Sequence, residues 1–298
     1  MKCKWIKKLT AGIIFLAAVG SLSGCQKAAT AENLFRDIEV NMTSVESAEE
    51  NQIVKLQMGD GDSAISQESN LDIEMIRDPA AVHRKGQQKT NMAGTKETQE
   101  MESYQVEEDG KTVIYSGTDE AWEKNAVEEK ETSSQQTVLF DGLQNLSGAF
   151  SVSQDLATVN KEECFELTGM ISGTQFQETF ADTLKALLGE DSSDLSGWNL
   201  QASEDEENNE ELQQKLNNIK VDCVIDIYRS NILPAKITFD LTDYLKAAGE
   251  ENAQVTSYTL EVTFVSYNDT KKIKVPKAVK ESAKDNGEDE AENSTDEM

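Results

Sequence analysis

Apolar and polar residues alternate with a period of two along much of this chain. The clearest runs cover residues 71–75, 103–106, 236–241 and 257–264, and a Glu-Asp-Gly turn signal at residues 108–110 follows the second of them. One-sided alternation is typical of antiparallel strands that bury one face and leave the other in water. Strands buried on both faces would instead be apolar throughout. The sequence therefore predicts a large antiparallel sheet.

Helical spacing is confined to a few segments. The clearest is an apolar stripe that ends before Gly189 and consists of Phe176, Phe180, Leu184, Leu187 and Leu188. Weaker patterns predict a first helix over residues 34–42, a short one over 139–148 and a last turn or two after Pro276. The acidic run 204–211 is typical of an exposed loop or of a helix start. The predicted class is α+β, a large sheet with a few helices on its apolar face.

The N-terminus has the pattern of an export signal. Four lysines precede a short apolar run at residues 13–19, and Leu22, Ser23, Gly24 and Cys25 then match a bacterial lipobox. The apolar run is about half of the roughly 20 residues that a membrane-spanning helix needs. We expect cleavage before Cys25 and attachment of a diacylglyceryl group to its thiol, since two acyl chains give stable anchoring. The alternative is an ordinary cleaved signal with an incidental cysteine.

These features predict four segments: a signal peptide at residues 1–24, a lipidated polar tether at 25–33, a single domain at 34–280 and an acidic tail at 281–298. The tail has almost no large apolar residue and cannot offset the entropy of ordering, so we expect it to be disordered. The expected location is the extracytoplasmic face of the cell membrane.

The chain is strongly acidic, with a formal net charge of −28, and loss of the four lysines in the signal would make it −32. Such a charge argues against nucleic acid as a partner, because phosphate binding needs clustered Lys and Arg. It also argues against adsorption on anionic lipid heads, so the anchor on Cys25 has to supply the membrane affinity. Solvated surface is the ordinary role of acidic runs; weak binding of calcium or of cationic wall components is the alternative.

Two cysteines, Cys164 and Cys223, remain in the mature domain. In an oxidising compartment they could form a disulfide. Strand parity places Cys223 with the apolar set of residues 221–227 and Cys164 opposite the apolar set of 165–171, so the two would lie on opposite faces of the sheet. The pattern favours two free thiols, unless a bulge reverses one parity.

No catalytic, metal or cofactor site is indicated. His83 is the single histidine, beside Arg84 and Lys85, and we expect it in a solvated loop. No Cys/His cluster has zinc spacing, no glycine-rich loop opens a helix, and Asp60-Gly61-Asp62 lacks the rest of a calcium loop. Residues 169–173 share only the ending of a nucleophile elbow, which gives little support to a serine hydrolase.

Several fragments, in order, resemble one family: residues 71–79, 94–104, 109–115, 120–124, 233–240 and 272–279. They are similar to the Firmicutes lipoproteins of the DUF6612 type, which resemble the LolA/LppX lipoprotein-carrier fold. The resemblance implies a strongly curved sheet, wrapped like half a barrel around helices on its concave face, sometimes enclosing a lipid-sized apolar cavity. It brings no shared catalytic residue. The acidic insertion at 203–211 and the acidic tail depart from the family pattern.

The leading hypothesis is a membrane-anchored, non-enzymatic lipoprotein that binds a lipid or another hydrophobic ligand in the hollow of the sheet. The candidate cavity-lining residues are Phe176, Phe180, Leu184, Leu187, Leu188, Tyr258, Leu260, Val262 and Phe264. The plain interpretation of the helical stripe is that it packs on the sheet as core. The alternative functions are an envelope module that binds a protein or the cell wall, and a secreted hydrolase.

Overall fold

The computed structural model describes residues 29–60, 64–118, 121–127, 142–188, 206–248 and 254–285. Thirteen strands of these segments form one sheet: β1 (Ser47–Met58), β2 (Ile65–Ile76), β3 (Ala81–Met92), β4 (Thr95–Glu108), β5 (Lys111–Thr118), β6 (Ala121–Val127), β7 (Phe150–Val152), β8 (Ala157–Val159), β9 (Glu162–Ser172), β10 (Lys220–Tyr228), β11 (Pro234–Asp240), β12 (Val255–Tyr267) and β13 (Lys284–Asp285).

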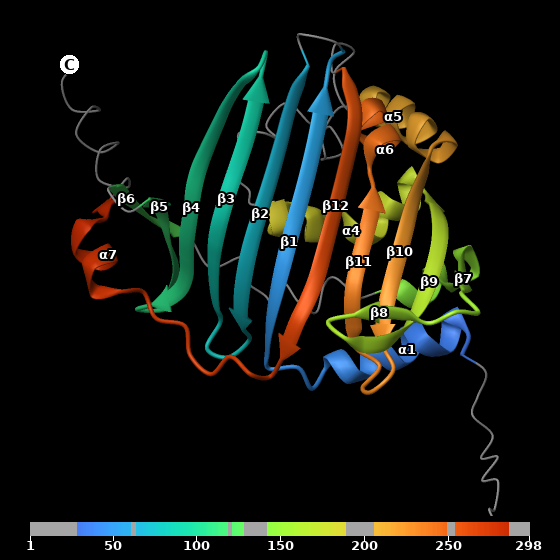
Figure 1. The fold of residues 1–298 in the computed structure, drawn as a ribbon, viewed down its shortest axis with the longest axis horizontal. Coiled ribbons are helices and arrows are strands. Elements are labelled where there is room, and N and C mark those ends of the chain that lie inside the picture. Colours follow the sequence, from blue (N-terminus) through green and yellow to red (C-terminus); the bar gives the residue numbers. More distant parts are fainter. Residues whose placement is uncertain are drawn as a thin grey trace, which may run out of the picture.

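The sheet is open. Its order is β13-β6-β5-β4-β3-β2-β1-β12-β11-β10-β9-β7, and β8 also pairs with β9. Among the described strands every pair is antiparallel except the short β13–β6 pair. Figure 1 shows the strands β4, β3, β2, β1, β12, β11, β10 and β9 side by side in this order, with β1 and β12 at the centre. The predicted α+β class with a large antiparallel sheet is therefore confirmed, and the sheet does not close into a barrel.

Tight turns connect the central strands. Between β4 and β5 only Asp109 and Gly110 intervene, and both have positive φ, 54° and 75°. A two-residue loop with this geometry matches the right-handed twist of its strands, and Asp-Gly is among its preferred sequences. The turn predicted at residues 108–110 is thus confirmed. Ala93 and Gly94 make the corresponding turn between β3 and β4.

The helices are α1 (Ala31–Met42), α3 (Leu143–Leu146), α4 (Gly173–Leu188), α5 (Glu206–Asn218), α6 (Thr242–Ala248) and α7 (Lys277–Ser282), with a 3₁₀ turn η2 (Ser147–Ala149) after α3. The Oγ1 of Thr30 caps α1 by accepting a hydrogen bond from the Asn33 N–H at 3.3 Å. The Arg77 guanidinium donates to the carbonyls of Met42 and Thr43 at the other end, at 3.1 and 3.0 Å. Arg77 follows β2, so this contact joins α1 to the sheet.

Four of these helices agree with the sequence-based predictions, and one was not predicted. The apolar spacing predicts α1, α4 and α7, and of the set at 139–148 the structure keeps α3 and η2, while Leu139 lies outside the described residues. The acidic run 204–211 contains the start of α5 at Glu206, which confirms the helix-start interpretation of this run. Helix α6 was not predicted, although Leu241, Tyr244 and Leu245 have helical spacing and are all buried.

The main hydrophobic core lies on one face of the sheet, which we call the inner face. Strands β1 and β9 to β12 supply one side of it, and α1, α3, α4, α5 and α6 supply the other. Figure 1 shows α4, α5 and α6 behind the sheet and α1 below β10 and β11. The helices therefore cover the inner face over the later strands, and α4 extends behind β12 and β1 toward β2, which leaves the inner face of β3 and β4 beside the core.

A smaller cluster occupies the opposite, outer face at the other end of the sheet. Tyr104, Tyr115 and Trp122 from β4, β5 and β6 are buried there against Ile273 and Val279 of the C-terminal segment. The ammonium group of Lys280 on α7 pairs with Glu108 and lies 6.0 Å from the Tyr115 ring centre. One helix thus packs on the outer face, in addition to those expected on the inner one.

Secondary structure continues past the predicted domain limit at residue 280. Helix α7 ends at Ser282 and β13 covers Lys284–Asp285. The remainder of the predicted tail, the tether up to residue 28 and the signal with Leu22, Ser23, Gly24 and Cys25 lie outside the described residues.

Candidate functional site

Four of the candidate cavity residues come from β12 and share the inner face. Tyr258, Leu260, Val262 and Phe264 are buried, and their cross-strand partners on β1 are Leu56, Val54, Gln52 and Glu50 in that order. Residues paired across antiparallel strands point to the same side of the sheet. Along this row, the partners on β1 therefore change from apolar, Leu56 and Val54, to polar, Gln52 and Glu50.

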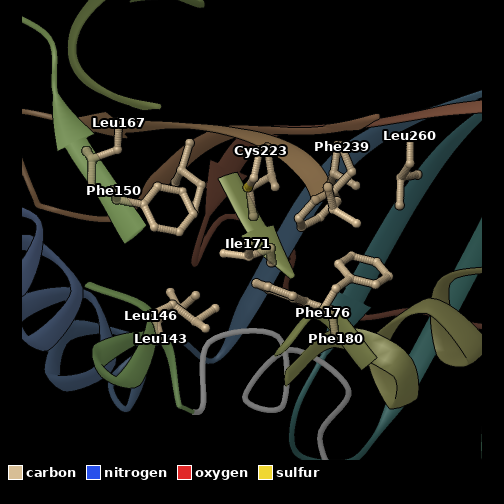
Figure 2. Close-up of a cluster of buried hydrophobic side chains, with 14 of the residues drawn as sticks. Leu143, Leu146, Phe150, Leu167, Ile171, Phe176, Phe180, Cys223, Phe239 and Leu260 are labelled. Atoms are coloured by element: carbon tan, nitrogen blue, oxygen red, sulfur yellow. The ribbon is translucent and has the colours of Figure 1, made fainter. Parts of the chain in front are cut away.

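The two described members of the helical stripe pack against side chains of the protein itself. The Phe176 ring centre lies 5.3 Å from that of Phe239 and 4.9 Å from that of Tyr244, and the Phe180 ring centre lies 5.0 Å from that of Phe239. Figure 2 shows these rings facing β11, with Leu260 nearby. Their packing agrees with the plain interpretation of the stripe as core. Leu184, Leu187 and Leu188 belong to α4, but their side chains lie outside the described residues.

Next to this core, one cross-strand row of the inner face contains charged residues among the apolar ones. Glu50 of β1 lies between Phe264 of β12 and Ile73 of β2, and Ile73 in turn pairs with Arg84 of β3. Glu50 is 1% exposed, and neither of its carboxyl oxygens has a hydrogen-bond partner within the described part of the chain. A buried polar atom without a partner is rare in folded proteins, so this row is the candidate functional site.

The electrostatics of the row follow from burial. Loss of solvation raises the pKa of the Glu50 carboxyl to about 7, and the positive charge of Arg84 opposes that rise. Burial likewise lowers the pKa of Arg84, and Glu50 opposes that shift. The phenol of Tyr267 is close enough to feel the Glu50 charge, but it donates its hydrogen bond to the Pro234 carbonyl at 2.8 Å. Glu50 thus changes charge near neutral pH.

A separate apolar cluster adjoins Glu50 on the same face. It consists of Ile73, Met75 and Val82, with Leu71 packed against it, and it is distinct from the main core. Its members come from β2 and β3, where Met75 pairs with Val82. The inner face therefore carries two apolar regions with the Glu50 row at their border.

Sequence reasoning missed Glu50 and Arg84. The alternation in β1 puts residues 48, 50, 52, 54, 56 and 58 on the inner face, and two of these are Glu50 and Gln52, both 1% exposed. Two polar residues inside the alternating set hide the strand pattern that reveals the other strands. A signal was nonetheless present, because Val54, Leu56 and Met58 continue the same alternation.

His83 is not in a loop, contrary to expectation. It lies within β3 on the outer face, and its ring stacks on that of Tyr104 at 4.3 Å between centres. Its Nε2 is 3.0 Å from Glu102, and its Nδ1 is 3.5 Å from Glu74. Cross-strand pairing explains the contacts, because His83 lies opposite both Glu74 and Tyr104. Strand packing thus accounts for this histidine.

The outer face also holds a buried acid, Asp226 of β10, which is 7% exposed. Burial raises its pKa to about 6, the neighbouring Glu166 and Glu261 add to the rise, and Lys236 opposes it. Lys236 forms an ion pair with Glu261 at 2.6 Å. One lysine therefore faces three carboxyl groups, which leaves the row acidic.

Both described cysteines are free and buried. Cys223 packs in the main core on the inner face, whereas Cys164 packs with Val159, Tyr228 and Ala235 in another cluster. Tyr228 is the cross-strand partner of Cys164, and Cys223 pairs with Gly169. The predicted separation of the two thiols on opposite faces is therefore confirmed.

Within the described segments, no group of three or more His, Cys, Asp and Glu side chains is arranged to hold a metal ion. No helix there has the length and apolarity needed to cross a membrane.

Comparisons with known proteins give a family and a set of distant structures. The model of DUF6612, described as a family of unknown function, matches residues 30–284, and no curated protein matches the sequence. LprF from Mycobacterium bovis is similar with a TM-score of 0.44 and 10% identity, over 83% of this chain and 96% of LprF. For the lipoprotein LppX from Mycobacterium tuberculosis the values are 0.41 and 13%, over 82% and 98%.

A LolA superfamily protein from Nitrosomonas europaea is also similar, with a TM-score of 0.23 and 9% identity, over 85% of this chain and 97% of that protein. The expected family and the expected structural neighbours are both found.

Proposed function

This chain belongs to the DUF6612 family, and we propose that it is a non-enzymatic lipoprotein of the extracytoplasmic membrane surface that binds a hydrophobic ligand against the inner face of its sheet. The observation that carries the proposal is the apolar cluster of Ile73, Met75 and Val82, which lies on the inner face of β2 and β3 outside the main core. A hydrophobic ligand needs an apolar surface with a few polar groups that fix its orientation. The adjoining row with Glu50 and Arg84 supplies such groups.

The part of the inner face that is packed against helix α4 is not available to a ligand. Phe176 and Phe180 are occupied with Phe239 and Tyr244, so we place the ligand beside them, toward β1, β2 and β3. Val262 and Phe264 are the candidate cavity residues nearest that side, since they pair with Gln52 and Glu50, but both are buried in the main core and the Phe264 ring stacks on that of Tyr267.

Anchoring at Cys25 would keep this domain near the membrane. Helix α1 begins at Ala31, six residues after Cys25, and six extended residues span at most about 20 Å. The lipid bilayer is therefore a source of ligand within reach of the fold. No reaction is needed for this role, and none is proposed.

Lipid analysis of the purified protein tests the proposal. We expect organic extracts of the protein, purified without added lipid, to contain a stoichiometric amphiphile that is absent from a matched extract of an unrelated protein. Recovery of no lipid, together with failure to bind a fluorescent hydrocarbon probe, would refute the proposed function.

The alternative of an envelope module with a protein partner predicts an exposed apolar patch. Five large apolar residues of the described chain are exposed, Val40, Met92, Leu156, Met170 and Val265, and they come from five separate segments. None of them is the cross-strand partner of another in the described pairs, so they form no continuous apolar row on the sheet.

A further inference from the structure

We propose that Glu50 binds the head of the ligand, and that the ligand is an uncharged amphiphile whose polar head carries hydroxyl groups, as in the acylglycerol class. This inference rests on the proposed hydrophobic-ligand function and specifies the chemistry of the same site.

The first argument is the unmet hydrogen-bonding capacity of Glu50. Its side chain is 1% exposed, and both carboxyl oxygens lack a hydrogen-bond partner within the described residues. The nearby phenol of Tyr267 already donates to the Pro234 carbonyl. A carboxylate accepts hydrogen bonds at two oxygens, so the missing partner is a group with donors.

The second argument is the apolar frame around Glu50. Phe264 flanks it on β12 and Ile73 flanks it on β2, and both are 2% exposed or less. Ile73 belongs to the cluster of Met75 and Val82. A ligand head at Glu50 would therefore have its hydrocarbon chain beside apolar side chains, which is the arrangement that an amphiphile requires.

The third argument concerns charge. Arg84 lies in the same cross-strand row, one strand beyond Ile73, and its positive charge acts on Glu50. The row therefore already holds one negative and one positive charge, and a charged head would add another charge to a buried site. A fatty-acid carboxylate would add a second negative charge, and an alkylammonium group would add a second positive one. Hydroxyl groups donate to Glu50 without changing this balance.

Three ligands that share one acyl chain test the head chemistry: 1-oleoylglycerol, oleic acid and oleylamine. Displacement of a fluorescent hydrocarbon probe from the purified full-length protein at pH 7.5 gives each affinity. We expect 1-oleoylglycerol to bind about tenfold more tightly than the other two, since one or two hydrogen bonds to a buried charged group are worth about one power of ten.

Substitution at Glu50 tests the residue. Glu50→Met removes the acceptors and keeps a side chain of similar length, so we expect the tenfold preference for 1-oleoylglycerol to disappear while the probe still binds. The matched control is Glu49→Met on the same strand, because Glu49 points to the outer face and accepts a hydrogen bond from Thr270. Circular dichroism checks that both variants fold, and Glu50→Gln, which keeps one acceptor, should give an intermediate preference.

The outcomes separate this inference from the proposed function. If the wild-type protein binds neither the probe nor any of the three ligands, the function fails and this inference falls with it. If it binds the probe but prefers oleic acid or oleylamine, the head chemistry is wrong while the function stands. If the preference for 1-oleoylglycerol survives Glu50→Met, the assignment of Glu50 is wrong.

Discussion

At the scale of single residues, the buried carboxyl group of Glu50 makes folding stability depend on pH. Burial raises its pKa from 4.5 to about 7. A folded-state pKa above the unfolded value favours the protonated folded protein, so this contribution is complete below about pH 4.5 and is lost as the pH rises through 7. We expect Glu50→Gln to increase the free energy of unfolding at pH 8 by about 2 kcal/mol, with little change at pH 4.5.

Urea denaturation of both proteins between pH 4.5 and 8 measures this difference. Equal pH dependence in the wild type and in Glu50→Gln would show that the Glu50 carboxyl has an ordinary pKa, and therefore that it is hydrated or paired in solution.

Asp226 provides a second, independent prediction of the same sign on the outer face. Its pKa is raised to about 6 by burial, with Glu166 and Glu261 adding to the effect. Its contribution to stability is therefore complete below its ordinary pKa of 3.8 and is lost as the pH rises through 6. Asp226→Asn should stabilise the fold by about 1 kcal/mol at pH 7.5 and leave it unchanged near pH 3.8.

Thermal denaturation at several pH values checks the Asp226 prediction. Asp222→Asn is the matched control, because Asp222 lies on the same strand and face but is exposed. A stabilisation of equal size in the control would assign the effect to net charge rather than to the buried site.

The site could not be read from the sequence at this scale. The alternation on β12 singles out Tyr258, Leu260, Val262 and Phe264, and of these Phe264 is the cross-strand partner of Glu50. Glu50 was not selected, because its cross-strand neighbour Phe264 lies far away along the chain. Desolvation of an acid is a property of that long-range pairing and has no local sequence signal.

At the scale of elements, Gly86 marks a place where β3 comes too close to β2 for any side chain. A Cβ atom added to Gly86 would lie 2.0 Å from the Asn70 carbonyl oxygen, a backbone atom that cannot rotate away. We expect Gly86→Ala to lower the free energy of unfolding by about 2 kcal/mol or more. The control is Gly148→Ala, where an added Cβ meets nothing within 4 Å.

Chemical denaturation of the two alanine variants measures this difference in the free energy of unfolding. If Gly86→Ala proves as stable as the wild type, β2 and β3 can separate at this position, and their close approach is not a constraint on the sheet.

Strands were easier to predict than the positions of helices. Residues 257–264 alternate cleanly because β12 buries one face, and the structure confirms that strand. Helix α6 is only seven residues long, Thr242–Ala248, and its short apolar set was not distinguished from the end of the preceding strand. The docking of α7 on the outer face depends on contacts of Val279 with strands far earlier in the chain, so its place could not be predicted from local spacing.

At the scale of the whole molecule, the net charge of −28 opposes adsorption on anionic membranes. The lipid anchor proposed at Cys25 is then the means by which the domain stays at the membrane. We expect Cys25→Ala to move most of the protein from the membrane to the soluble fraction in cell fractionation, without changing its thermal stability. Full retention of the variant at the membrane would refute the need for the anchor.

The central claim is that a hydrophobic ligand contacts the inner face at β1, β2 and β3. The most direct measurement is photo-crosslinking of the purified protein with a lipid that carries a diazirine in its acyl chain, followed by mass-spectrometric mapping of the labelled peptides. We predict labels within β1 and β2 and in the part of β3 near Val82, reduced by excess unlabelled 1-oleoylglycerol. Labels confined to α7 and the outer-face cluster, or labelling that excess ligand does not reduce, would contradict the claim.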